Sequence, residues 1–165
     1  MFLGEHLHSL DAKGRVILPV RFREELQSSV VTSEIDGCLA LWPIEDFQRR
    51  AAEMKERARG GPRDRDVARV FFAGAVEATP DRQGRVALPP HLRQFARLER
   101  EVVVNGAFDH VEIWDAATWR EKKRRGEQAL SGDGSAEEAG EGTAAGMSSG
   151  MASGSGEARS EPPLG

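Results

Sequence analysis

The hydrophobic pattern of the chain begins with short apolar runs that are separated by turn residues. Phe2–Leu10 is predicted to form a first strand, although its apolar and polar positions alternate poorly. Ser29–Glu34 and Cys38–Trp42 are predicted to pair as a β-hairpin, because the Asp36-Gly37 dipeptide between them favours a tight turn. Val102–Val104 is a further run of β-branched residues, which is typical of a buried strand.

After Pro43 the spacing of apolar residues changes to that of helices. An apolar stripe at intervals of three and four residues predicts one helix, and a second is predicted over Asp64–Ala75. A shorter helix is expected over Val20–Gln27, with Arg23 on its solvated face. The two long helices need a partner surface, so we predict that they mediate self-association. The residues assigned to this contact are Ile44, Phe47, Met54, Val67 and Phe71.

A nonapeptide occurs twice, and the rest of the chain is organised around it. Asp11–Pro19 reads DAKGRVILP and Asp81–Pro89 reads DRQGRVALP, so that six residue types recur 70 positions apart. Leu39–Trp42 and Val111–Trp114 continue the repeat, and Asn105-Gly106 is predicted to form a turn before the second of them. The chain is therefore predicted to be a tandem duplication of one small β-rich unit.

The shared residues of the nonapeptide predict a tight turn between two strands. Asp at the first position can accept backbone N–H bonds, and Gly at the fourth tolerates a positive φ. Pro at the ninth position ends the strand and begins a short helix. These residues are Asp11, Gly14 and Pro19 in the first copy and Asp81, Gly84 and Pro89 in the second. Arg15 and Arg85 directly follow the turn glycines, so we expect them at the hairpin tips.

Three stretches carry a resemblance to a known family: Met1–Glu5, which reads MFLGE, the first nonapeptide, and the second Asp-x-x-Gly-Arg at Asp81–Arg85. Over about Met1 to Glu127 the sequence resembles the MraZ proteins, which are bacterial transcription regulators. The resemblance implies an α+β, mainly β fold with two tandem SpoVT-AbrB-type swapped-hairpin units, a double-split β-barrel. The second copy departs at Arg82-Gln83, where the first has Ala12-Lys13, so the two tips need not contribute equally.

The chain is divided by composition into four segments. We assign residues 1–50 to the first unit, 51–75 to connecting helices, 76–127 to the second unit and 128–165 to a tail. From Ser131 onward the tail is rich in Gly, Ser, Ala and Glu, so we predict that it is disordered and dispensable for folding and DNA binding. It holds six acidic residues and one arginine, and the whole chain has a net charge of −4, which leaves +1 for the remainder. A nearly neutral body must contact nucleic acid through local clusters.

Arg15 and Arg85 are the candidate DNA-reading residues. An arginine offers a planar fork that can hold guanine O6 and N7 together, and a two-stranded β-ribbon fits the major groove. The alternative is an ion pair with Asp11 or Asp81 across the same hairpin, which would stabilise an exposed site only slightly. An aspartate can also orient the arginine before it meets DNA, so the two interpretations are compatible. Lys13 and Arg82 flank the tips and are candidate phosphate contacts, which set register.

Several other residues attract a functional hypothesis and are better explained structurally. His6 and His8 share a strand face, but without an apparent third ligand we favour a polar face or an interface over a metal pair. Cys38 is the only cysteine, lies in an apolar run and is expected to be buried. Arg120–Arg125 is interpreted as a basic run at the end of a helix that Asp115 caps. Three tryptophans are expected to anchor the core: Trp42, Trp114 and Trp119.

No catalytic constellation, phosphate-cradling loop or nucleophile elbow is present in the sequence, so we do not expect an enzyme, a cofactor, a bound metal or a small-molecule substrate. No apolar stretch is long enough to suggest a membrane span, and we expect a cytoplasmic, nucleoid-associated protein. The family resemblance implies ring-like homo-oligomers that bind G-rich direct repeats in the promoter of the cell-division and cell-wall gene cluster, including the chain's own promoter. Repression is the expected outcome.

Two other classes of function remain open at this point. One is an antitoxin, because AbrB-like hairpins also occur in antitoxins, although these are usually single-unit dimers. The other is an assembly protein whose hairpins mediate only subunit contacts, and which would show no salt-dependent DNA binding.

Overall fold

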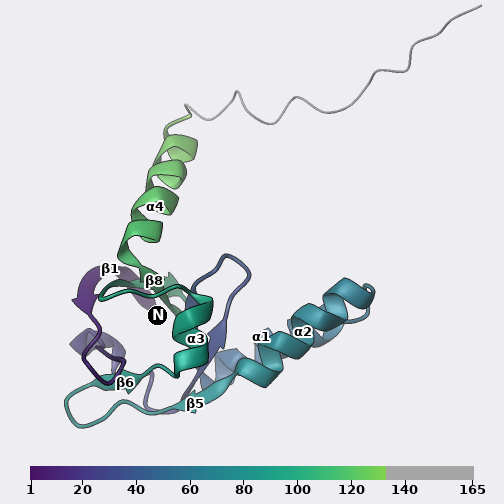
Figure 1. Cartoon of the computed structure of the whole chain (residues 1–165), viewed down its shortest axis with the longest axis horizontal. Coiled ribbons are helices and arrows are strands. Elements are labelled where there is room, and N and C mark those ends of the chain that lie inside the picture. The colour runs from purple at the N-terminus through teal and green to yellow at the C-terminus, as the bar shows by residue number, and fades with distance from the viewer. Residues whose placement is uncertain (133–165) are drawn as a thin grey trace, which may run out of the picture.

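The structure is a computed structural model that describes residues 1–132 (Figure 1). It contains eight strands and four α-helices in these residues, with antiparallel pairing throughout. The strands are β1 (Phe2–Ser9), β2 (Arg15–Ile17), β3 (Ser29–Ser33), β4 (Leu39–Pro43), β5 (Val76–Ala78), β6 (Arg85–Ala87), β7 (Glu101–Phe108) and β8 (Val111–Asp115). The helices are α1 (Ile44–Arg57), α2 (Pro62–Gly74), α3 (Pro90–Phe95) and α4 (Ala116–Ser131), with a 3₁₀-helix over Val20–Phe22. The helices span more of the described chain than the strands do, so the architecture is mixed α+β and not mainly β.

The two halves of the chain share one sheet. Its six strands follow the order β1-β7-β8-β4-β3-β5, so that β1 of the first half pairs with β7 of the second, and β5 pairs with β3. A second sheet consists of β2 and β6 alone, with Val16 opposite Val86. Each nonapeptide strand therefore finds its ladder partner in the other repeat, and neither half completes its β-structure without the other.

The main core lies between these two sheets. The nonapeptide residues Val16, Leu18, Val86 and Leu88 are at most 2% exposed, and they pack with the inward residues of the large sheet. Phe22 and Leu92, which follow the two prolines, join the same cluster. Because both repeats supply matching residues to one core, the turns that lead into β2 and β6 are held against each other.

Figure 1 shows α1 and α2 side by side as a helical hairpin that projects from the strands, whereas α4 extends away in another direction. Met54, Ala68 and Phe71 form a second buried cluster between α1 and α2, and Phe47 and Val67 pack against it. The predicted self-association stripe is thus wrong in part, because Met54 and Phe71 are already covered within the chain. The apolar stripe of each helix packs against the other helix of the same chain, and not only against a second subunit as we expected.

Asn105-Gly106 does not form the predicted turn and instead lies inside β7. Gly106 is paired with Gly4 of β1, and a Cβ at Gly106 would collide with the backbone of Phe2 and Leu3. The glycine is needed because the two strands approach closely here. An Asn-Gly dipeptide alone does not distinguish this need from a turn. The turn between β7 and β8 falls at 109–110, after Phe108 at a φ of 73°.

Two predicted boundaries also change. The helix expected over Val20–Gln27 is a 3₁₀-helix followed by turns, because its N–H groups bond three residues back, as in Arg23 N to Val20 O. The ordered chain does not end near Glu127, since α4 continues to Ser131 and ends at Gly132 with a φ of 81°. The predictions for the tail beyond residue 132 lie outside the described residues.

Candidate nucleic-acid interface

The first candidate tip is a turn closed by Asp11. Its Oδ1 accepts the backbone N–H groups of Lys13 and Arg15, both at 2.9 Å, and Gly14 donates to the Asp11 carbonyl at 2.9 Å. Gly14 has a φ of 72°, in the left-handed region that favours glycine. These backbone bonds, above all the one from Arg15, lower the pKa of Asp11 below its ordinary value. The turn therefore presents an ionised carboxylate beside the arginine.

The second tip repeats this geometry. Asp81 Oδ1 accepts from the backbone N–H groups of Gln83 and Arg85 at 2.9 Å, and Gly84 has a φ of 77°. The bond from the Arg85 N–H, with the nearby guanidinium in support, lowers the pKa of Asp81 to about 2. Both aspartates therefore remain charged at neutral pH.

Each candidate arginine is paired with the aspartate of its own turn. Arg15 Nε lies 2.6 Å from Asp11 Oδ2, and Arg85 Nε lies 2.8 Å from Asp81 Oδ2. Arg15 Nη1 also approaches Asp81 Oδ2 at 4.0 Å, which joins the two tips into one charged cluster. The ion pair that the sequence offered as an alternative is present. Only the Nε atoms donate to the carboxylates within the described residues, so the Nη groups of both arginines keep unused donors.

Pairing of β2 with β6 places the two arginines on a single outward face. Val16 and Val86 point into the core, so Arg15, Ile17 and Arg85 lie on the opposite side of the ribbon, where Ile17 is 39% exposed. The arginine side chains are 25% and 31% exposed. The two tips of one chain therefore form one surface and not two separate ones.

Lys13 and Arg82 are both exposed on the turns that flank this ribbon face. Within residues 1–132 neither side chain makes an ion pair or a hydrogen bond. Because Arg15 and Arg85 are balanced by their aspartates, Lys13 and Arg82 supply positive charge at the tips that no partner in the described chain neutralises.

Sequence reasoning missed Arg93 and misplaced Arg23. Both side chains are half-buried, and each donates from Nε to a main-chain carbonyl at the end of β2 or β6. Arg23 was expected on a solvated face, but its guanidinium lies against Gly84 of the other repeat. The two arginines stand 70 residues apart, like the nonapeptides, and this spacing could have identified them.

The remaining candidates have structural surroundings. His6 Nε2 lies 2.9 Å from Arg21 Nη2, and no cluster of three metal-binding side chains occurs in the described part of the chain. Burial raises the pKa of the Cys38 thiol far above its ordinary value. Trp42 and Trp114 are 6% and 3% exposed, while Trp119 is half-buried. Asp115 caps α4 as predicted, through N–H bonds from residues 117 and 118.

Arg120–Arg125 lies in the middle of α4 and not at its end. Its lysines reach back to the body, where Lys122 pairs with Asp36 at 3.2 Å and Lys123 with Glu5 at 2.8 Å. Arg124 and Arg125 share Glu121. The run is therefore largely neutralised by nearby acids. No helix within residues 1–132 combines the length and apolar character needed to cross a bilayer.

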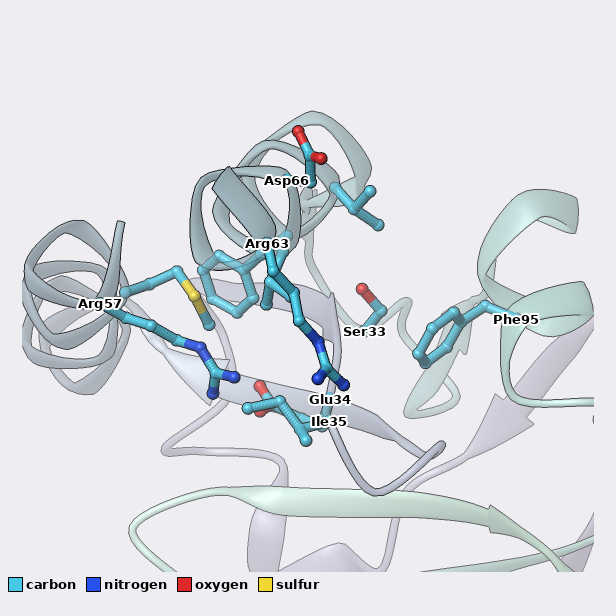
Figure 2. A pocket seen from close by; sticks show the side chains of 11 residues that line it. Ser33, Glu34, Ile35, Arg57, Arg63, Asp66 and Phe95 are labelled. Atoms are coloured by element: carbon cyan, nitrogen blue, oxygen red, sulfur yellow. The ribbon is translucent and has the colours of Figure 1, made fainter. Parts of the chain in front are cut away.

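A groove of about 690 Å³ separates the helical hairpin from α3 and the β3–β4 loop. Figure 2 shows Ile35, Arg63 and Phe95 facing its space from three different elements. Ile35 and Val70 are each 60% exposed and Phe95 is 43% exposed. This groove lies outside the ribbon face, and exposed apolar side chains gather around it.

Comparison with known proteins agrees with the repeat. The profile of the family described as "MraZ protein, putative antitoxin-like" matches the chain twice, at residues 1–70 and 71–137. The transcriptional regulator MraZ of Kineococcus radiotolerans is 48% identical over 120 residues, which cover 72% of this chain and 84% of the relative. The regulator of the same name from Cutibacterium acnes is 43% identical over 132 residues, covering 79% of this chain and 93% of the relative. The family profile spans both nonapeptides, and the matches identify a regulator, not an enzyme. The chain belongs to the MraZ family of transcriptional regulators and carries two tandem MraZ domains.

Proposed function

We propose that the β2–β6 ribbon is the DNA-reading surface of this regulator. The observation that carries the proposal is the pairing of the two nonapeptide strands, which sets Arg15 and Arg85 on one outward face. A two-stranded ribbon fits the major groove of B-DNA, where arginine can hold guanine O6 and N7 with two donors. The strand exchange between repeats also supports a swapped-hairpin, AbrB-like description of the fold, with units at residues 1–50 and 76–127.

The aspartates orient the arginines and do not compete with this role. Asp11 and Asp81 bond the Nε atoms, so the terminal Nη groups are left to face a guanine edge. The same contacts hold each planar fork in place before DNA arrives, which lowers the ordering cost of binding. Lys13 and Arg82 contact phosphates, which adds affinity and register without sequence preference.

We further propose that the regulator acts as a repressor in the cytoplasm, on nucleoid DNA. Its targets are G-rich direct repeats in the promoter of the cell-division and cell-wall gene cluster, which includes its own. One ribbon has a small footprint, whereas specific protein–DNA interfaces usually bury about 1,000–2,500 Å² of protein surface. A ring-like homo-oligomer that presents one ribbon per chain to successive repeats would supply the missing area and an avidity gain.

The exposed apolar rim of the groove is the surface that we propose for this self-association. Ile35, Val70 and Phe95 remain exposed there, in contrast to the buried residues between α1 and α2. Val70→Glu should shift the sedimentation coefficient toward the monomer at micromolar concentration. Phe108→Glu, at an apolar position that is 65% exposed and outside the groove lining, is the matched control. A wild-type protein that sediments as a monomer would refute the oligomer.

Binding to the chain's own upstream region tests the DNA-reading role. Arg15→Ala should weaken binding to the native repeats by about 5- to 150-fold for each guanine that the arginine no longer holds. Lys13→Ala should instead lower affinity for native and scrambled duplexes alike and reduce the salt slope by about one phosphate contact. Gel shifts at two salt concentrations, with melting curves for each variant, measure both effects.

Arg69→Ala is the matched control, because Arg69 also pairs with a nearby aspartate but is 70% exposed on α2. It removes the same charge away from the ribbon and should leave binding unchanged. If Arg15→Ala binds the native repeats as tightly as wild type, the arginine serves only to pair with Asp11. If wild type shows no salt-dependent DNA binding at all, the chain is an assembly protein.

A further inference from the structure

Two arginines outside the nonapeptides cover the turn glycines of the opposite repeats. Arg93, on α3 of the second half, lies over Gly14 of the first, so that a Cβ on Gly14 would stand 2.5 Å from its Cζ. Arg23, which caps the 3₁₀-helix of the first half, lies in the same way over Gly84 of the second. Both glycines are buried although they belong to turns. The contacts run from each repeat to the other.

Each arginine is anchored where the two repeats cross. Arg23 donates from Nε to the Leu18 carbonyl at 2.9 Å, and Leu18 in turn donates from its backbone N–H to the Gly84 carbonyl at 2.8 Å. On the other side, Arg93 donates to the Leu88 carbonyl at 3.0 Å, and Leu88 donates to the Gly14 carbonyl at 3.0 Å. Each guanidinium therefore bridges the end of its own nonapeptide strand and the turn of the other nonapeptide.

This arrangement differs from that of an arginine that faces DNA. Arg23 and Arg93 are half-buried, as Arg15 and Arg85 are, but their Nε donors are used by main-chain oxygens and not by a carboxylate. Their guanidinium groups occupy the space that a side chain on the turn glycine would fill. Arg15 is the residue directly after Gly14, so the position of its guanidinium depends on the position of the turn.

We propose that Arg23 and Arg93 are positioning residues that act crosswise: Arg93 sets the Arg15 tip and Arg23 sets the Arg85 tip. The proposal rests on the proposed DNA-reading function of these tips. In consequence each repeat orients the DNA-reading arginine of the other, and a change in one half is felt at the tip of the opposite half.

Crossed double-mutant cycles test this coupling. Arg93→Met keeps an unbranched stem but removes the charge and the Nε donor. It should weaken binding to the native repeats in the wild-type and Arg85→Ala backgrounds, and should have little effect once Arg15 is alanine. Arg23→Met should show the mirror pattern, with its effect absent in Arg85→Ala. The coupling within the crossed pairs, Arg93 with Arg15 and Arg23 with Arg85, should be at least about threefold in Kd. The coupling between two arginines of the same repeat should be close to none.

Binding should be measured at low salt, where phosphate contacts keep the weakened variants measurable. Equal effects of Arg93→Met in the Arg15→Ala and Arg85→Ala backgrounds would overturn the proposal. So would a decrease in affinity that is the same for native and scrambled DNA and lowers the salt slope, because Arg93 would then be a phosphate contact. If Arg93→Met fails to fold, Arg93→Lys carries the same test, since lysine lacks the planar group that covers Gly14.

A second measurement does not depend on DNA. Amide exchange of ¹⁵N-labelled protein should speed up at Gly14 and Arg15 in Arg93→Met, while Gly84 and Arg85 stay at the wild-type rate, and Arg23→Met should reverse this. Faster exchange on the uncrossed side, or equally on both, would overturn the positioning role. Crossed exchange with DNA affinity that is unchanged in Arg93→Met but lowered by Arg15→Ala would overturn the positioning role, whereas affinity that is unchanged in both variants would refute the DNA-reading function of the tips.

Discussion

In the first half of the chain the arginine of the turn lies 2.6 Å from its aspartate, and in the second half the equivalent distance is 2.8 Å. The two turn glycines differ by only a few degrees in φ, at 72° and 77°. The strands that follow, β2 and β6, have three residues each and pair with each other. Where the repeats meet, each serves as the environment of the other, so a change in one repeat would disturb the geometry of the opposite one.

Away from this contact the halves differ. The strand before the first turn, β1, has eight residues, but its counterpart β5 has three. After the matched tryptophans, α1 packs on α2 around Phe71, whereas α4 buries only Ala116 of its sixteen residues. The repeat is therefore retained where symmetry-related residues touch, and it diverges where they do not.

Truncation of a core leucine in each nonapeptide tests whether the two halves share one core, and it should change stability more than the other variants. Leu18→Ala and Leu88→Ala remove side chains that are 0% and 2% exposed in the same cluster. Each should lower the free energy of unfolding by about 2–5 kcal/mol, with similar values for the two because the surroundings are alike. Urea unfolding followed by circular dichroism measures both variants.

Val20→Ala is the control, because Val20 is 76% exposed beside the same strand and should change stability by less than about 0.5 kcal/mol. Two separate unfolding transitions, one sensitive to Leu18 and the other to Leu88, would show that the repeats fold as independent units. The conclusion that both repeats share a single core would then be wrong.

How far the sequence predicted these features depends on the range of the interactions. The Asp36-Gly37 turn and the Asp115 cap were predicted because each rests on contacts within a few residues. The prediction of a turn at Asn105-Gly106 was wrong because this glycine is required by its close contact with β1, about a hundred positions earlier. Local sequence signals contain no information about that strand. Arg23 was misplaced for the same reason, since its contact with Gly84 exists only after the repeats interlock.

The turn glycines provide the next comparison. Gly14→Ala and Gly84→Ala introduce a Cβ at a positive φ, which costs about 1–2 kcal/mol, and also push it into an arginine of the other repeat. Gly37→Ala is the matched control, because Gly37 has a φ of 87° but nothing within 4 Å of an added Cβ. Both nonapeptide variants should be less stable than Gly37→Ala in urea unfolding. Equal stability of all three variants would mean that the two arginine side chains move away from the added Cβ atoms at no measurable cost.

The residues that directly precede the matched strands β4 and β8 are Cys38 and His110. Cys38 is a buried thiol, whereas the His110 ring stacks on Trp42 with centroids 4.0 Å apart. His110 Nδ1 lies 2.7 Å from Asp109 Oδ1, and its Nε2 lies 3.7 Å from Glu112 Oε1. Desolvation opposes the charged imidazole, but these two carboxylates outweigh it and raise the pKa of His110 above its ordinary value. The second half therefore holds a titrating group at a place where the first half holds none near neutral pH.

The smallest expected effect is the pH dependence that His110 adds. Because its pKa is higher in the folded than in the unfolded chain, the stabilisation is complete below the unfolded pKa of about 6.5 and is lost as the pH rises through the folded value. His6 and His8 have lowered pKa values, so their contribution has the opposite sign and is lost as the pH falls. The difference in unfolding free energy between wild type and His110→Gln separates the two, and it should shrink from pH 6 toward pH 8. His91→Gln, which removes an exposed histidine from α3, controls for composition. A difference that stays constant or grows over this range would show that the carboxylates do not hold the proton on His110, and the contrast with Cys38 would then be one of packing alone.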